Sequence, residues 1–201
     1  HGIDVDPDGN VWVTDAVSSA TIPAGDHRGH QVVKFSPTGE VLFTLGTPGV
    51  AGDGPDHFIS PSDVAVADNG SVFIADGHSN DGNNRVMKFS SDGEFIMEWG
   101  QTGYGPGEFR TLHAIAIDPS GRVFVGDRSN SRIQIFDQEG THLATWTQFG
   151  RPSGIFIEDD GTIYVADSES DDVCSSDLSR MTCKIPGGKW GFGSERCKPV
   201  G

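Results

Sequence analysis

Histidine and serine alternate at one recurring position of this chain. The position opens each of four copies of a sequence pattern, and it is occupied by His1, Ser62, His113 and Ser153. If equivalent positions of the copies converge on a common axis, the imidazoles of His1 and His113 lie near it together. Three imidazoles around an open fourth position form a catalytic zinc site. We therefore interpret His1 and His113 as zinc ligands; the alternative is that both are polar residues lining a channel without metal.

The pattern that carries these residues is a pair of alternating strands joined by a tight turn. Its copies read GIDVDPDGNVWVTD from Gly2, DVAVADNGSVFIAD from Asp63, AIAIDPSGRVFVGD from Ala114 and GIFIEDDGTIYVAD from Gly154. Alternation of apolar and polar residues with a period of two predicts strands. The Asp, Asn, Pro and Gly residues between them predict hairpin turns. Two more alternating segments follow each of the first three copies, beginning at residues 30, 85 and 132.

Four antiparallel strands per copy are typical of one blade of a β-propeller. The predicted fold class is therefore all-β, an open, partial propeller with about three and a half four-stranded blades. The predicted blades cover residues 1–61, 62–112 and 113–152, and an incomplete blade covers 153–172. Because an open arc leaves sheet edges and faces uncovered at both ends, we expect it to be prone to aggregation.

An aspartate ends the second strand of every copy. These residues are Asp15, Asp76, Asp127 and Asp167, and Arg85 and Arg132 open the third strand of the second and third copies. We interpret them as a structural clamp in which the carboxylate binds arginine or backbone N–H at the blade corner. A feature present in every repeat is more typical of architecture than of catalysis.

The pattern stops after Asp172. Residues 173–201 contain all three cysteines and carry 5 Lys and Arg against 2 Asp and Glu, whereas residues 1–172 carry 9 against 27. The run from Val173 to Leu178 resembles the translation of a sequencing adapter, so we interpret 173–201 as an artefactual, poorly ordered segment outside the propeller. The alternative is a small natural appendix that contains cysteines. The acidic balance of 1–172 argues against a nucleic-acid partner. No apolar run is long enough to span a membrane as a helix.

Two family resemblances follow from particular motifs. The segment Asp127-Arg-Ser-Asn-Ser-Arg-Ile-Gln-Ile-Phe136 resembles an NHL repeat, the unit of a group of six-bladed propellers. A closer resemblance is to the peptidyl-α-hydroxyglycine α-amidating lyases, in a bacterial form. It rests on residues 1–15, His30–Phe35, Pro61–Val66, Asp76-Gly77, Trp99-Gly100, Gly105–Phe109, Leu112–Ile117 and Asp127-Arg128. That family cleaves a peptidyl hydroxyglycine into a peptide amide and glyoxylate, with a zinc ion held by three histidines.

The lyase resemblance implies roles for five residues. His1 and His113 match zinc ligands, and the third ligand would come from a fifth blade that this chain lacks, so we expect the chain alone to hold zinc weakly or not at all. Arg128 matches an active-site arginine that binds the substrate carboxylate. His78 replaces the catalytic tyrosine of the family, and it would act as a base near neutral pH or bind a different ligand. The backbone carbonyl of Ile3 matches a ligand of a structural calcium ion. The resemblance also implies a secreted or periplasmic protein.

Two classes of function are consistent with these features. The first is a zinc-dependent lyase acting on a small-molecule or peptide substrate, as His1, His113 and Arg128 indicate. The second is a non-catalytic propeller that binds a protein or a small ligand through blade loops such as Gly77–Asn84, because the fold alone does not determine function. A different metal-dependent propeller enzyme, such as a lactonase, is a third alternative.

Overall fold

The computed structural model describes residues 1–17, 25, 27–78 and 82–168. Nearly all regular structure in these residues is β-strand, with one short 3-10 helix, η1 (Arg128–Asn130). Among the same residues, no helix is long and apolar enough to cross a membrane. The segment 173–201, which we interpreted as artefactual and poorly ordered, lies outside the described residues.

The strands form three four-stranded antiparallel sheets and one two-stranded antiparallel sheet, each built from consecutive strands. The first sheet contains β1 (Ile3–Val5), β2 (Val11–Asp15), β3 (Gln31–Phe35) and β4 (Val41–Leu45). The second contains β5 (Pro61–Val66), β6 (Val72–Asp76), β7 (Arg85–Phe89) and β8 (Phe95–Trp99). The third contains β11 (Leu112–Ile117), β12 (Val123–Asp127), β13 (Arg132–Phe136) and β14 (His142–Trp146). The fourth contains β15 (Pro152–Ile157) and β16 (Ile163–Asp167), and β9 (Gln101–Thr102) pairs in parallel with β10 (Glu108–Phe109). The predicted all-β class and the open, propeller-like arrangement are confirmed.

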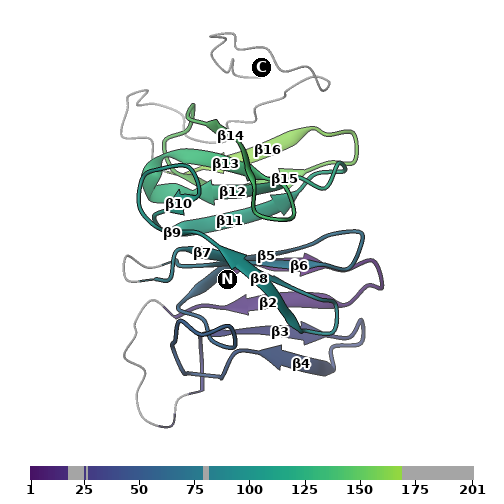
Figure 1. Ribbon diagram of the computed structural model, residues 1–201. Helices are drawn as coiled ribbons and strands as arrows, with labels where there is room; N and C mark the ends of the chain where they lie inside the picture. Colours follow the sequence, from purple (N-terminus) through teal and green to yellow (C-terminus); the bar gives the residue numbers. More distant parts are fainter. Residues whose placement is uncertain (18–24, 26, 79–81, 169–201) are drawn as a thin grey trace.

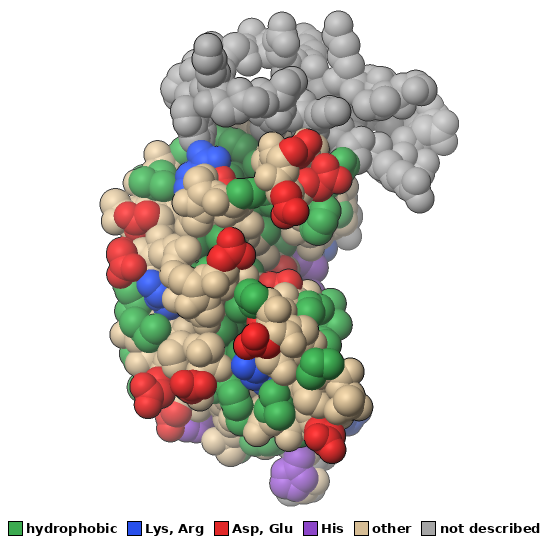
Figure 2. Space-filling view, turned by 90° about the vertical axis from the view of Figure 1, so that its right-hand side faces the viewer, with side chains coloured by type: hydrophobic (Ala, Val, Ile, Leu, Met, Phe, Trp, Pro, Cys, Tyr) green, Lys and Arg blue, Asp and Glu red, His purple; other side chains and the backbone are tan. Residues whose placement is uncertain are grey.

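Successive sheets pack face to face, and their first strands β1, β5, β11 and β15 lie side by side (Figure 1). Figure 2 shows that the stack has the outline of a crescent. Three clusters of buried apolar side chains fill the three interfaces between sheets. Trp12, Phe58 and Ile74 are fully buried at the first interface. Because burial of one such side chain contributes about 1.5–3 kcal/mol, packing between sheets stabilises the relative positions of the first strands.

The aspartate at the end of β6 binds the loop that precedes its sheet. Asp76 accepts a hydrogen bond from the backbone N–H of Ile59 at 2.8 Å and one from Nε of Arg85 at 3.2 Å. The guanidinium of Arg85 also donates to backbone carbonyls in the inserted loop, those of Asp53, Gly54 and His57. The carboxylate and the guanidinium together hold the insertion against the blade.

The third sheet repeats this arrangement, and the other two sheets have simpler forms. Asp127 accepts hydrogen bonds from the N–H of Arg110 and from Nε of Arg132, both at 2.7 Å. Asp15 accepts hydrogen bonds from the N–H of Gly29 and from the side chain of Gln31. Asp167 accepts from the N–H groups of Gly150 and Arg151. In the second, third and fourth sheets the carboxylate thus fixes the entry of the chain into the blade, whereas Asp15 fixes the segment that leads into β3.

Candidate functional site

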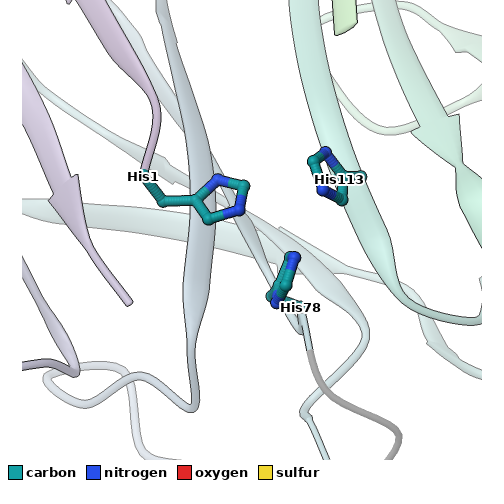
Figure 3. Close-up of side chains that lie close together, drawn as sticks. All are labelled: His1, His78 and His113. Atoms are coloured by element: carbon teal, nitrogen blue, oxygen red, sulfur yellow. The ribbon is translucent and has the colours of Figure 1, made fainter. Parts of the chain in front are cut away.

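Three histidines from three different sheets meet beside the first strands (Figure 3). His1 precedes β1, His113 is the second residue of β11, and His78 follows the end of β6. The ring centroids are 4.4 Å apart for His1 and His78, and 4.8 Å apart for the other two pairs. One nitrogen from each ring can be chosen so that all three lie within 4.8 Å of one another. The three imidazoles therefore form a compact, nearly equilateral cluster.

A β-bulge places His113 at this position. The register between β11 and β12 shifts between Leu112 and Ala114, so His113 is the extra residue in its strand. The same shift occurs around Ser62 in β5 and around Ser153 in β15. A bulge leaves one residue without a direct partner and redirects its side chain. Three of the four alternating His and Ser positions, Ser62, His113 and Ser153, are therefore bulge positions of the first strands.

Backbone carbonyls of the next sheet orient two of the rings. Nδ1 of His1 lies 2.7 Å from the carbonyl oxygen of Ser62, and Nδ1 of His113 lies 2.8 Å from that of Ser153. Because a carbonyl oxygen only accepts, Nδ1 must carry the proton in both rings, and Nε2 keeps its lone pair. Metal-binding histidines commonly donate their second ring N–H in this way. The serines thus act through their carbonyl groups rather than through their hydroxyls.

His78 reaches the cluster because the chain turns sharply after β6. Gly77 has a φ of 146°, and a Cβ atom there would lie 2.6 Å from the backbone nitrogen of Asn84. The backbone N–H of His78 then donates to the carbonyl oxygen of Ser60 at 3.0 Å. A residue other than glycine would clash at this turn. The half-buried ring of His78 is consequently held on a fixed segment of backbone.

Two arginines lie near the cluster and act on its electrostatics. Burial lowers the pKa of His78, and the neighbouring His113 and Arg128 lower it further. Burial also lowers the pKa of His113, and the positive charges of Arg128 and Arg151 contribute. Both rings are therefore neutral near pH 7, which is the state that binds a metal ion. Arg151, directly before β15, was not among the residues that sequence reasoning selected, and no motif distinguished it.

The donor set fits a zinc ion. Three imidazoles, two of them with Nδ1 donating to a carbonyl oxygen so that Nε2 is the ligand atom, correspond to the three protein ligands of a catalytic zinc site. Imidazoles bound tetrahedrally with Zn–N distances near 2.0–2.1 Å would have ring centroids about 5 Å apart. The observed separations of 4.4–4.8 Å require only small ring movements to reach that arrangement.

Carboxylates on the first strands are used to join the sheets. Asp4 accepts a hydrogen bond from the N–H of Val66 at 2.7 Å, and Asp63 accepts one from the N–H of Ile115 at 2.9 Å. Burial raises the pKa of Asp4, and it raises that of Asp63 to about 6. These contacts fix the spacing of β1, β5 and β11, the strands next to which the histidines lie.

The residues selected from the sequence fall into two groups. His1, His78, His113 and Arg128 come together, whereas the clamp residues Asp15, Asp76, Asp127, Asp167, Arg85 and Arg132 bind loops and blade corners. Ile3 lies opposite Val13 in β1. Since the carbonyl of Gly2 accepts from Thr14, alternation of the antiparallel ladder turns the carbonyl of Ile3 away from β2. Zinc binding, and calcium binding at Ile3, stay predictions.

Known proteins are similar to this chain in sequence and in fold. Residues 58–150 match a family model described as a 6-bladed beta-propeller. NHL repeat-containing protein 3 of Homo sapiens is 37% identical over 184 residues, which cover 86% of this chain and 47% of that protein. Peptidyl-alpha-hydroxyglycine alpha-amidating lyase 1 of Drosophila melanogaster is 37% identical over 148 residues, covering 68% of this chain and 25% of that protein. A chain in the crystal structure of a nidogen/laminin complex has a TM-score of 0.60 and 20% identity, covering 83% of this chain and 56% of that one. The chain thus spans about half, or less, of the length of these curated relatives.

Proposed function

This chain belongs to the NHL-type six-bladed β-propellers and has amidating lyases among its relatives, and on that premise we propose that the whole protein is a zinc-dependent lyase. Its substrate is a peptidyl α-hydroxyglycine or a similar carbinolamide, and its products are an amide and glyoxylate. The observation that carries the proposal is the cluster of His1, His78 and His113, whose rings fit zinc beside the guanidinium of Arg128.

Each reactive part of such a substrate finds a matching group near the cluster. The substrate carboxylate pairs with the guanidinium of Arg128, a geometry that arginine supports with two parallel hydrogen bonds. The positive charge of Arg151, which also acts on His113, favours the same anion. A zinc ion bound by the imidazoles supplies Lewis acidity toward the substrate hydroxyl oxygen. These groups would hold the substrate with its central carbon over the histidines.

The reaction itself requires a proton transfer. The bond between the central carbon and the amide nitrogen breaks, and the carbon–oxygen bond becomes a carbonyl. The hydroxyl group loses its proton, and the leaving nitrogen gains one. A base must accept the hydroxyl proton. A neutral His78 could do so, but only with a ring nitrogen that does not bind a metal ion. The role of His78 therefore depends on whether it is a ligand.

The direct test is glyoxylate release from an N-acyl α-hydroxyglycine such as α-hydroxyhippurate. The zinc-loaded protein should release glyoxylate and the amide in equal amounts. Removal of the metal by a chelator should abolish the reaction, and added zinc should restore it. Spontaneous breakdown of the substrate without protein provides the baseline. A metal-loaded protein that does not exceed this baseline contradicts the lyase proposal.

A second candidate is a propeller that binds a protein or small ligand without catalysis. The specific observation in its favour is the similarity to NHL repeat-containing protein 3, which extends over 86% of this chain. The chain also holds two inserted loops firmly through Arg85 and Arg132, as a binding surface requires. The loop Gly77–Asn84, selected from the sequence for this role, lies only partly within the described residues. Metal binding without glyoxylate release would favour this function.

A further inference from the structure

We propose that His78 is the third metal ligand, so that the first three sheets of this chain hold a complete three-histidine site. The proposal rests on the zinc site of the proposed function but does not depend on the lyase reaction. It differs from the expectation raised by the sequence, in which the third ligand lay outside the chain. It also assigns to His78 a role other than that of the base.

The first argument is the symmetry of the cluster. The ring of His78 is 4.4 Å from that of His1 and 4.8 Å from that of His113, while His1 and His113 are 4.8 Å apart. The separation of the His78 ring from each of the other two rings is thus similar to the separation between those two rings. A base that acts on a substrate bound between the ring and the metal would need a larger separation from the ligands.

The second argument concerns the directions of the rings. The interplanar angles are 56° for the two pairs that include His78 and 69° for the remaining pair. Strongly inclined rings allow three nitrogen lone pairs to converge on one point, which parallel rings would not. Figure 3 shows the three side chains arranged around a common space. Inclined packing of neutral rings without metal has similar angles, so an experiment must separate the two.

The third argument is that the backbone at His78 is fixed. The N–H groups of Gly77 and His78 both donate to the carbonyl oxygen of Ser60, at 3.3 and 3.0 Å. Ser60 is itself buried, and its hydroxyl donates to the carbonyl of Val17. A ligand on a fixed segment loses little conformational entropy when metal binds. Hydrogen bonds thus restrict all three histidines: those to Ser60 fix the backbone of His78, and those to Ser62 and Ser153 orient the rings of His1 and His113.

Zinc binding to His78→Ala tests this inference. Zinc affinity of the chain is measured by competition with a chromophoric chelator, and bound Co²⁺ is recorded by its visible absorption. The parent should bind one equivalent and give a spectrum of a tetrahedral nitrogen-rich site. Loss of one of three ligands should weaken zinc binding by about 100-fold or more, since loss of an outer-shell partner alone costs 10–100-fold. The Co²⁺ spectrum should change as well.

Two further variants make the result specific. His27→Ala removes an exposed histidine that lies outside the cluster, and it should leave zinc affinity unchanged. His78→Gln keeps a similar side-chain volume and should weaken zinc as His78→Ala does, with a circular dichroism spectrum like that of the parent. The inference is overturned if both His78 variants bind zinc as tightly as the parent, or if the parent binds none.

The outcomes also separate this inference from the lyase proposal. Zinc binding that needs His78, without glyoxylate release from the loaded protein, supports the ligand and contradicts the lyase. Glyoxylate release together with unchanged zinc affinity in both His78 variants supports the lyase and contradicts the ligand.

Discussion

At the scale of single residues, positive charge is concentrated near the histidine cluster, although the molecule as a whole is acidic. The chain carries a formal net charge of -15, yet Arg128 and Arg151 act together on the ring of His113. Arg128 also acts on His78. A local concentration of positive charge in an acidic protein attracts small anions to that place. This is the property that a site for a carboxylate-bearing substrate needs.

Arg128→Ala should therefore weaken substrate binding. Loss of a hydrogen-bonded charge pair costs about 1.5–3 kcal/mol, so we expect KM for an N-acyl α-hydroxyglycine to rise about 10- to 100-fold. Steady-state glyoxylate assays on the zinc-loaded protein measure this change. For a substrate analogue with an amide in place of the carboxylate, KM should differ little between parent and variant. An equal loss for both substrates would show that Arg128 does not bind the carboxylate.

Gly77→Ala should displace His78 through the backbone. The new Cβ would lie 2.6 Å from the nitrogen of Asn84, and the φ of 146° is itself unfavourable for alanine. We expect a loss of stability of about 1–3 kcal/mol together with weaker zinc binding. Gly161→Ala is the matched control, because Gly161 has a φ of 82° with no atom near its Cβ position. If zinc affinity falls equally in both variants, the turn at Gly77 does not position His78.

At the scale of elements, buried carboxylates connect strands with loops and with each other. The Asp127 carboxylate is fully buried and holds the N–H of Arg110 and the side chain of Arg132. The corresponding Asp15 accepts hydrogen bonds from the neutral groups of Gly29 and Gln31. The two sites place the same residue type at the same corner with different partners. Their comparison separates the contribution of the arginine from that of the corner.

Asp127→Ala should cost more stability than Asp15→Ala. The first variant leaves the nearly buried guanidinium of Arg132 without its carboxylate, a loss of about 3–5 kcal/mol. The second removes hydrogen bonds to uncharged groups, for which about 1–3 kcal/mol is expected. Urea unfolding followed by circular dichroism gives both values. Equal losses would indicate that the arginine adds nothing to the corner.

Asp63 should make stability depend on pH. Its pKa in the folded chain is about 6, above the ordinary value of 3.8, because burial disfavours the charged form. The folded state then binds the proton more tightly than the unfolded state, so stability falls as pH rises from about 4 to 6. Asp63→Asn keeps an acceptor for the N–H of Ile115 and removes this titration. Relative to the parent, the variant should gain up to about 3 kcal/mol between pH 4 and pH 7.5. If the unfolding free energies of parent and variant depend on pH in the same way, the pKa of Asp63 is not raised by burial.

At the scale of the whole molecule, the sequence period was sufficient to predict the sheets and the proximity of His1 and His113, but not the local geometry of the site. Alternating residues between turns predict each strand pair, and repetition predicts that the sheets are equivalent. The bulge at His113 could not be predicted, because it arises from register between β11 and β12 rather than from residue type. The place of His78 beside His1 depends on the turn at Gly77 and on contacts between sheets. Local patterns carry no information about such contacts.

The open ends of the arc should govern how the molecule behaves in solution. Ile3 and Val5 on β1 are 67% and 57% exposed, and Phe156 on β15 is 62% exposed. In a repeat array each blade is stabilised by its neighbours, and the outer faces of the first and last sheets have none among the described residues. Apolar side chains on such faces promote association.

We expect the chain to self-associate at high concentration, and Val5→Lys with Phe156→Lys to reduce this. Sedimentation velocity over a range of concentrations measures it. Leu143→Lys, at a residue of 50% exposure on β14, is the control and should change association less. A parent that stays monomeric throughout the concentration range would show that the exposed faces do not drive self-association.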